Sequence, residues 1–162
     1  MGYEVALRQF LCFEVGSRRF GLWSSVVLEA VRAVAVVPLP KAPPAVRGVI
    51  NLRGKTVPVF DLRSRFGLPP KEVEVTDHFI VARAGERIVA LQADQAIGLY
   101  EVAEGDIEEA KRVTPAAEYV EGIVKMPDGL VLIHDPATFL STAESERLDE
   151  ALGPVSGPGR SR

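Results

Sequence analysis

The sequence predicts an all-β protein with a few short helices, folded as two small β-barrels that share an interface. Short runs rich in Val, Ile and Phe are separated by frequent turn residues, which is typical of small antiparallel sheets. These turns fall at Gly16-Ser17, Arg53-Gly54, Ala84-Gly85 and Pro127-Asp128-Gly129. An internal repeat supports the same fold, because residues 46–52 align without gaps with residues 120–126, and residues 57–61 then fall on residues 131–135. A copy of roughly 70 residues would be only marginally stable alone, so the two copies are expected to pack together.

Each half of the chain is expected to begin with two strands joined by a glycine turn. Residues 13–20 resemble residues 81–88 in their order of strand, glycine turn, basic residue and strand. Within the first of these strands, Leu11, Phe13 and Val15 alternate and should share one face. The repeated unit therefore starts near the N-terminus of each half.

Two further segments complete the first copy. Val27 and Val31 lie four positions apart with Glu29 off their face, which fits a short amphipathic turn. Residues 56–61 predict a strand, because Val57 and Val59 would lie on one face and Phe60 on the other. Pro58 cannot donate a ladder hydrogen bond, so this strand should contain an edge-like or bulged position.

Capping residues predict the short helices. Asp61 precedes a single helical turn as its N-cap, and Asp135, followed by proline, repeats the pattern. Ser141 and Glu144 have the spacing of a capping box, which opens a helix over residues 142–152. The aspartates therefore have structural roles.

A Pro-rich link at residues 68–72 is the predicted boundary between the two copies. After the last helix the chain is rich in Gly, Pro and Ser, which is typical of disorder. The expected organisation is one domain over residues 1–152, with subdomain one at about 9–67, subdomain two at about 73–140, the terminal helix at 142–152 packing back, and a disordered tail at 153–162.

Composition argues against several classes of function. The chain has 19 Lys and Arg against 22 Asp and Glu, a formal net charge of −3 and a pI near 5.5, whereas nucleic acids and anionic lipids require a basic surface. One Cys cannot form an internal disulfide, and two His do not make up a usual zinc site, so we expect no metal and no cofactor. No window is long and apolar enough for a signal peptide or a membrane span. We expect a cytoplasmic protein without nucleic acid and without direct membrane contact.

The residues with the greatest potential for catalysis have structural interpretations. His134 occupies a strand position equivalent to Phe60 in the repeat, which favours a packed or half-exposed strand residue over a catalytic one. His78 and the neighbouring Asp77 are expected in a solvated turn at the start of a strand. Cys12 lies in mid-strand and is expected to be an inert small hydrophobe. We therefore predict that the chain is not an enzyme.

Two alternatives to a protein-binding module stay open. A small-barrel nucleic-acid binder is suggested by five basic residues within 19 positions, although few aromatic residues lie among them: Arg47, Arg53, Lys55, Arg63 and Arg65. An enzyme or metal site would use His78, His134 and Asp135. The acidic pair Glu108 and Glu109 is expected on a solvated polar helix capped by Asp106.

The longest motif of the chain resembles a known family. Residues 42–54 (APPAVRGVINLRG) and residues 57–63 (VPVFDLR), followed by Phe66-Gly67, closely resemble the core signature of the CheW family, the bacterial chemotaxis coupling proteins. The resemblance extends from about Gln9 to Leu152 and therefore covers nearly the whole chain.

This resemblance implies two five-stranded, SH3-like barrels packed side by side in a CheW-like arrangement. It implies a non-enzymatic adaptor that couples chemoreceptors (methyl-accepting chemotaxis proteins) to the regulatory domain of a CheA-type histidine kinase. Such an adaptor would work in receptor arrays at the inner membrane. The positions that match the family's partner-binding motifs are Val27, Glu29, Asn51, Leu52, Arg53 and Gly54.

Overall fold

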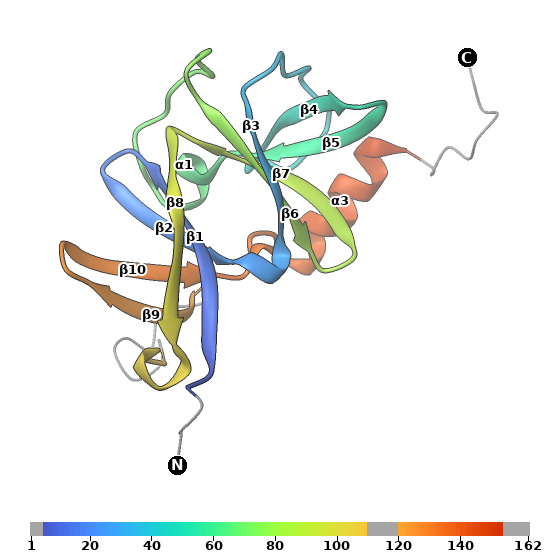
Figure 1. Ribbon diagram of the computed structural model, residues 1–162. Helices are drawn as coiled ribbons and strands as arrows, with labels where there is room; N and C mark the ends of the chain where they lie inside the picture. Colours follow the sequence, from blue (N-terminus) through green and yellow to red (C-terminus); the bar gives the residue numbers. More distant parts are fainter. Residues whose placement is uncertain (1–4, 110–119, 154–162) are drawn as a thin grey trace.

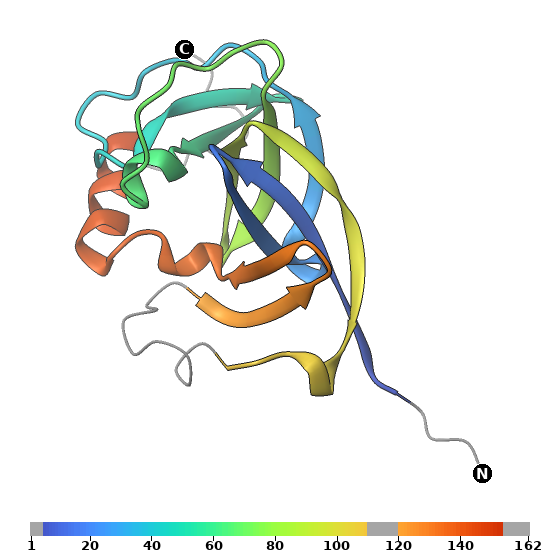
Figure 2. The same cartoon turned by 90° about the vertical axis from the view of Figure 1, so that its left-hand side faces the viewer.

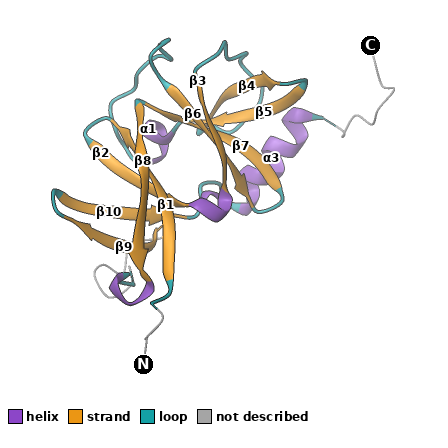
Figure 3. Ribbon diagram, viewed as in Figure 1, coloured by secondary structure: helices purple, strands orange, loops and turns teal. Residues whose placement is uncertain are grey.

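The structure is a computed structural model that describes residues 5–109 and 120–153, and it consists mainly of two five-stranded sheets (Figure 1 and Figure 3). The first sheet has the strand order β8-β1-β2-β10-β9, and the second sheet has the order β3-β6-β7-β5-β4. The strands are β1 (Leu7–Val15), β2 (Arg18–Trp23), β3 (Val27–Arg32), β4 (Val46–Leu52), β5 (Lys55–Phe60), β6 (His78–Ala84), β7 (Arg87–Ala93), β8 (Gln95–Ala103), β9 (Val120–Met126) and β10 (Gly129–His134). The described helices are α1 (Leu62–Arg65) and α3 (Thr142–Leu152), with 3₁₀ turns at Ser24–Val26, Glu104–Asp106 and Pro136–Thr138. The predicted β-rich fold with few helices is confirmed.

The internal duplication predicted from the sequence is visible in the strand order. In the second sheet, β3, β4 and β5 occupy the places that β8, β9 and β10 have in the first sheet. Likewise, β6 and β7 occupy the places of β1 and β2. Each sheet also contains one parallel pair at the same place, β5 with β7 and β10 with β2. The repeat in sequence therefore corresponds to a repeat in structure.

The sheets do not follow the predicted division into residues 9–67 and 73–140. The first sheet takes two strands from the first half and three from the second, and the second sheet does the converse. The two copies thus exchange their first hairpins, β1–β2 and β6–β7. Local sequence patterns do not reveal this exchange, because a strand has the same residue pattern whichever sheet it joins. The predicted tail lies outside the described residues, except for Gly153.

Three apolar clusters hold the sheets together. The central cluster takes residues from both sheets and from α3, among them Phe13 of β1, Leu91 of β7 and Leu148 of α3, which are at most 1% exposed. Each sheet also encloses its own cluster, represented by Phe10 in the first sheet and Phe79 in the second. Consequently residues 10–13 of β1 are buried on both faces: Leu11, Phe13 and Val15 share one face, as predicted, in the central cluster, and Phe10 and Cys12 lie on the opposite side.

A single β-bridge joins the connection after β3 to β4. The backbone groups of Val37 and Val49 exchange two hydrogen bonds of 2.8 Å. The second copy repeats this bridge between Glu108 and Ile123. Glu108 therefore lies in extended backbone, and the prediction that it belongs to a polar helix capped by Asp106 is wrong, since the described residues up to 109 form a 3₁₀ turn at Glu104–Asp106 followed by the bridge.

The predicted helix caps are confirmed. The Asp61 side chain accepts hydrogen bonds from the backbone N–H groups of Arg63 and Ser64, and Asp135 caps its own turn. Ser141 and Glu144 form the complete capping box of α3. No helix within residues 5–109 and 120–153 is long and apolar enough to cross a membrane.

Helix α3 packs beside the second sheet (Figure 1 and Figure 2). Leu148 anchors its centre in the central cluster. Near its first turn, Glu144 accepts a hydrogen bond of 2.7 Å from Arg65, and further along, Asp149 accepts one of 2.5 Å from Arg87. The hydrogen bond from the Ser141 backbone and the Arg65 guanidinium keep the pKa of Glu144 below its usual value, although burial opposes this.

The predicted solvated turn at Asp77 is wrong, because this side chain is 1% exposed. Burial alone would raise the pKa of Asp77, but hydrogen bonds from the backbone of Glu74, from Lys71 and from Gln92 outweigh it and lower that pKa. Lys71 lies in the predicted link and approaches Asp77 to 2.9 Å. The burial of Asp77 could not be predicted from the sequence, because the residue that neutralises its carboxylate, Lys71, lies across a loop.

The structure places His134 in an aromatic environment. Its ring lies 5.0 Å from that of Phe20 and 5.2 Å from that of Phe66, and its Nδ1–H donates a hydrogen bond of 2.9 Å to the carbonyl oxygen of Leu132. Burial lowers the pKa of His134 to about 4. The predicted strand position is confirmed, and of the packed and half-exposed alternatives the structure shows the packed one, in the position that Phe60 occupies in the other copy.

We expect His134→Phe to remove part of the acid sensitivity of the fold. A folded pKa of about 4, below the ordinary value of 6.5, means that the unfolded chain binds the extra proton first. Stability from this group is therefore present above pH 6.5 and declines as the pH falls toward 4, by up to about 3 kcal/mol. Urea unfolding of both proteins at pH 7.5 and 4.5 tests this, because other groups cancel in the difference. An equal loss of stability in both proteins would contradict it.

Candidate functional site

The turn between β4 and β5 has a constrained backbone. Both central residues have positive φ, +50° at Arg53 and +85° at Gly54, as in a type I′ turn. Positive φ is unusual for arginine and costs free energy. The side-chain Oδ1 of Asn51 accepts a hydrogen bond of 2.7 Å from the N–H of Gly54 and so supports the turn.

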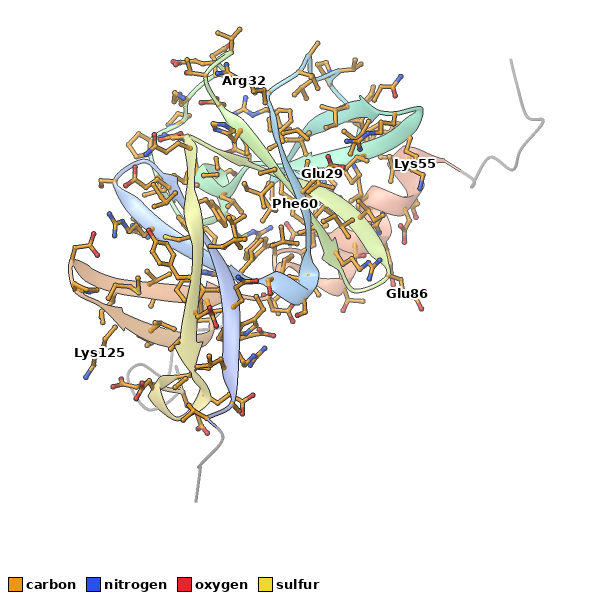
Figure 4. The ribbon with its side chains drawn as sticks, in the orientation of Figure 1. Glu29, Arg32, Lys55, Phe60, Glu86 and Lys125 are labelled. Atoms are coloured by element: carbon orange, nitrogen blue, oxygen red, sulfur yellow. The ribbon has the colours of Figure 1, made fainter. Side chains whose placement is uncertain are left out.

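This turn directs Arg53 toward Glu29 on β3. The two terminal nitrogens of Arg53 donate hydrogen bonds of 2.5 and 2.6 Å to the two carboxylate oxygens of Glu29, a bidentate arrangement. The hydrogen bond from Arg53 lowers the pKa of Glu29, against a small effect of burial. Figure 4 shows Glu29 on β3, which is an edge strand of the second sheet. Two residues predicted from separate motifs therefore form one ion pair.

A groove lies next to this ion pair. Its volume is about 500 Å³, and it is lined by apolar side chains with charged groups among them. We call it the pair groove. The lining residues are Leu28, Glu29, Leu52, Arg53, Lys55, Thr56, Val57, Pro58, Val81, Glu86, Arg87, Ile88 and Leu152.

The six predicted site residues divide into three groups. Glu29, Leu52 and Arg53 line the pair groove. Asn51 and Gly54 shape the turn that carries Arg53. Val27 lies apart from the groove, because it packs partly buried against the central cluster.

The segment around Glu29 is a strand, so the predicted amphipathic turn is wrong. Val27, Glu29 and Val31 are half-buried, while the residues between them are exposed, as expected for the two-residue period of β structure. Leu28 is 42% exposed and lines the groove, and the pairing of β3 with β6 shifts register at this point, between Val27 and Glu29. The prediction failed because it placed Val27 and Val31, four positions apart, on one face by the helical period.

Several groove residues had no signal in the sequence. Arg87 and Leu152 come from β7 and from the end of α3, far along the chain from the motif that contains Arg53. Leu28, by contrast, lies beside Glu29 in the sequence, and its exposure follows from the two-residue period of β3. Only the tertiary fold brings the distant residues to the groove.

Most of the basic residues that suggested nucleic-acid binding form ion pairs with acidic residues of the same chain. Four of these five residues are paired: Arg47 with Asp61, Arg53 with Glu29, Arg63 with Asp94 and Arg65 with Glu144. Such pairs leave little free positive charge for a phosphate backbone. The structure therefore gives no support to the nucleic-acid alternative.

The residues considered for catalysis lie in environments that do not favour catalysis. Cys12 is 1% exposed, and burial raises the pKa of its thiol, which makes it a poor nucleophile. His134 is enclosed by aromatic rings, and Asp135 is an N-cap. Within the described ranges, no group of three or more His, Cys, Asp and Glu side chains is arranged to hold a metal ion.

Comparisons with known proteins agree on one family. A family model described as the CheW-like domain matches residues 9–144. A chemotaxis protein CheW of Treponema pallidum is 26% identical over 146 residues, covering 86% of both chains, and protein FrzA of Myxococcus xanthus is 32% identical over 124 residues, covering 73% of this chain and 74% of its own. The crystal structure of the scaffolding protein TtCheW from Thermoanaerobacter tengcongensis superimposes with a TM-score of 0.78 at 27% identity, covering 86% of this chain and 96% of that chain.

Proposed function

The chain belongs to the CheW-like family, and on this premise we propose that it is a chemotaxis adaptor that joins a chemoreceptor to a CheA-type histidine kinase. The Glu29–Arg53 pair beside the pair groove is the observation that carries the proposal. Arg53, one member of this pair, lies in a turn at positive φ, and backbone strain of this kind collects at functional sites.

We assign the pair groove to the receptor. The cytoplasmic tip of a chemoreceptor is a helical hairpin, and an amphipathic helix binds best in a groove with an apolar floor and charged margins. Val57, Val81 and Ile88 supply apolar lining, and Arg53 supplies a fork of donors at the margin. Asn51 and Gly54 act through the turn, and Val27 supports β3 from the core side.

Kinase coupling requires a second contact that is present at the same time. An adaptor changes the state of a kinase only if its contacts differ in free energy between the kinase states. The regulatory domain of the kinase therefore binds away from the pair groove, so that both partners are held together. The chain itself performs no catalysis and needs no cofactor in this scheme, and it works in the cytoplasm at receptor arrays under the inner membrane.

Isothermal titration tests the two contacts separately. We expect the chain to bind a soluble receptor fragment that contains the helical tip, and to bind the isolated kinase regulatory domain. Saturation with one partner should leave the binding of the other intact, because the surfaces are separate. Mutually exclusive binding, or failure to bind either partner from the same organism, would contradict the proposal.

A further inference from the structure

Helix α3 ends at the pair groove. Its last residue, Leu152, is half-buried, and it packs partly against the central cluster while also lining the groove with Leu28 and Pro58. We propose that α3 forms one wall of the groove, that Leu152 contacts the helix bound there, and that Arg87 positions this wall. The inference rests on the proposed function of the groove and adds residues that the motif around Arg53 does not contain.

Arg87 connects the floor of the groove to α3. One of its terminal nitrogens donates hydrogen bonds to Asp149 at 2.5 Å and to Ser145 at 3.3 Å, two residues one helical turn apart. Because Arg87 also lines the groove, the same side chain contacts both parts. Only three helical residues follow Asp149, the last of them Leu152, so this contact holds the end of the helix in place.

The charges of the groove favour an amphipathic helix as the occupant. Arg53 and Arg87 are engaged with Glu29 and Asp149, whereas Lys55 and Glu86 have no ion-pair partner among the described residues. Lys55 begins β5 and Glu86 lies in the turn between β6 and β7, both on the side of the molecule where α3 lies (Figure 4). They offer one free charge of each sign beside apolar walls.

A bound helix would use all of these features together. Its apolar stripe would lie between Leu28 and Leu152, an acidic residue would meet Lys55, and a basic residue would meet Glu86. The bound helix would also cover the apolar side chain of Leu28, which is 42% exposed. The occupant is therefore an amphipathic helix of a partner protein with charges of both signs beside its apolar stripe.

Cysteine protection tests the contact without disturbing the fold. We would introduce Leu152→Cys and, as a control, Ala143→Cys at the exposed start of the same helix, and measure alkylation by a maleimide. The native Cys12 is 1% exposed and should stay unreactive. With the receptor-tip fragment at about ten times its Kd, the alkylation rate at position 152 should fall about tenfold, and the rate at position 143 should not change.

The positioning role of Arg87 is tested in the same assay. In the Leu152→Cys protein, Arg87→Ala should reduce the protection by the fragment, and Arg87→Lys should retain it, because lysine still reaches the carboxylate of Asp149. Loss of protection in neither variant, or in both, would overturn this role.

The outcomes separate this inference from the proposed function. If the fragment binds in titration and position 152 stays reactive, α3 is not a wall of the site, and the inference fails while the proposed function stands. If position 152 is protected at high protein concentration without the fragment, the occupant is a second copy of the chain, which also overturns the inference. If the fragment does not bind at all, both fail.

Discussion

Replacing Arg53 by glutamate is expected to weaken binding of the receptor-tip fragment about tenfold or more, measured by titration. The substitution places a second carboxylate next to Glu29 and removes the bidentate pair that borders the groove. Arg53 is 69% exposed, so the melting temperature should change little. Arg32→Glu is the matched control, because Arg32 is exposed on the strand that carries Glu29 but does not line the groove (Figure 4).

The double exchange Glu29→Arg with Arg53→Glu extends this experiment. It restores an ion pair of opposite polarity at the same place. We expect binding to recover in part, because the groove margin is rebuilt while its charges face the partner in reverse. Unchanged binding by Arg53→Glu alone would remove the pair from the site.

The second large effect is expected at Gly48, where an added methyl group would lower the stability of the whole fold. A Cβ atom there would lie 2.3 Å from the carbonyl oxygen of Val37 and 2.9 Å from a methyl carbon of Val36. The nearest atom belongs to the backbone that makes the bridge with Val49, so the bridge must shift. We expect Gly48→Ala to cost about 3 kcal/mol and to lower the melting temperature by roughly 10 °C.

Two other glycines provide a graded comparison for this prediction. At Gly122, the equivalent position of the second copy, a Cβ would meet the side chain of Ile107 at 2.8 Å, and a side chain yields more easily than backbone. At Gly105 nothing lies within 4 Å. The loss of stability should therefore fall in the order Gly48→Ala, Gly122→Ala, Gly105→Ala. A melting temperature of Gly48→Ala equal to that of Gly105→Ala would contradict the steric argument.

The repeat and the caps could be predicted from the sequence because they depend on neighbours in the chain. Asp61 and Ser141 hydrogen-bond to backbone within three residues, and such local contacts leave a clear residue pattern. The exchange of hairpins between the two copies leaves no such pattern. Because of this exchange, the two sheets do not follow the predicted division of the chain at residues 68–72.

The site was predictable only in part for the same reason. The family resemblance identified Glu29 and Arg53, but their pairing depends on the tertiary approach of β3 and the β4–β5 turn. Arg87 and Leu152 reach the groove from distant parts of the chain. Asp77 was misjudged because its neutralising partner, Lys71, lies in a loop whose course the sequence does not specify.

Co-sedimentation with receptor-containing membranes tests the central claim most directly. The cognate kinase is mixed with these membranes in the presence of the wild-type chain, of the Arg53→Glu variant, or of no adaptor, and the pelleted kinase is measured. We predict that the wild-type chain carries the kinase into the pellet and that the variant carries little. Equal kinase in the pellet with and without the wild-type chain would contradict its role as an adaptor.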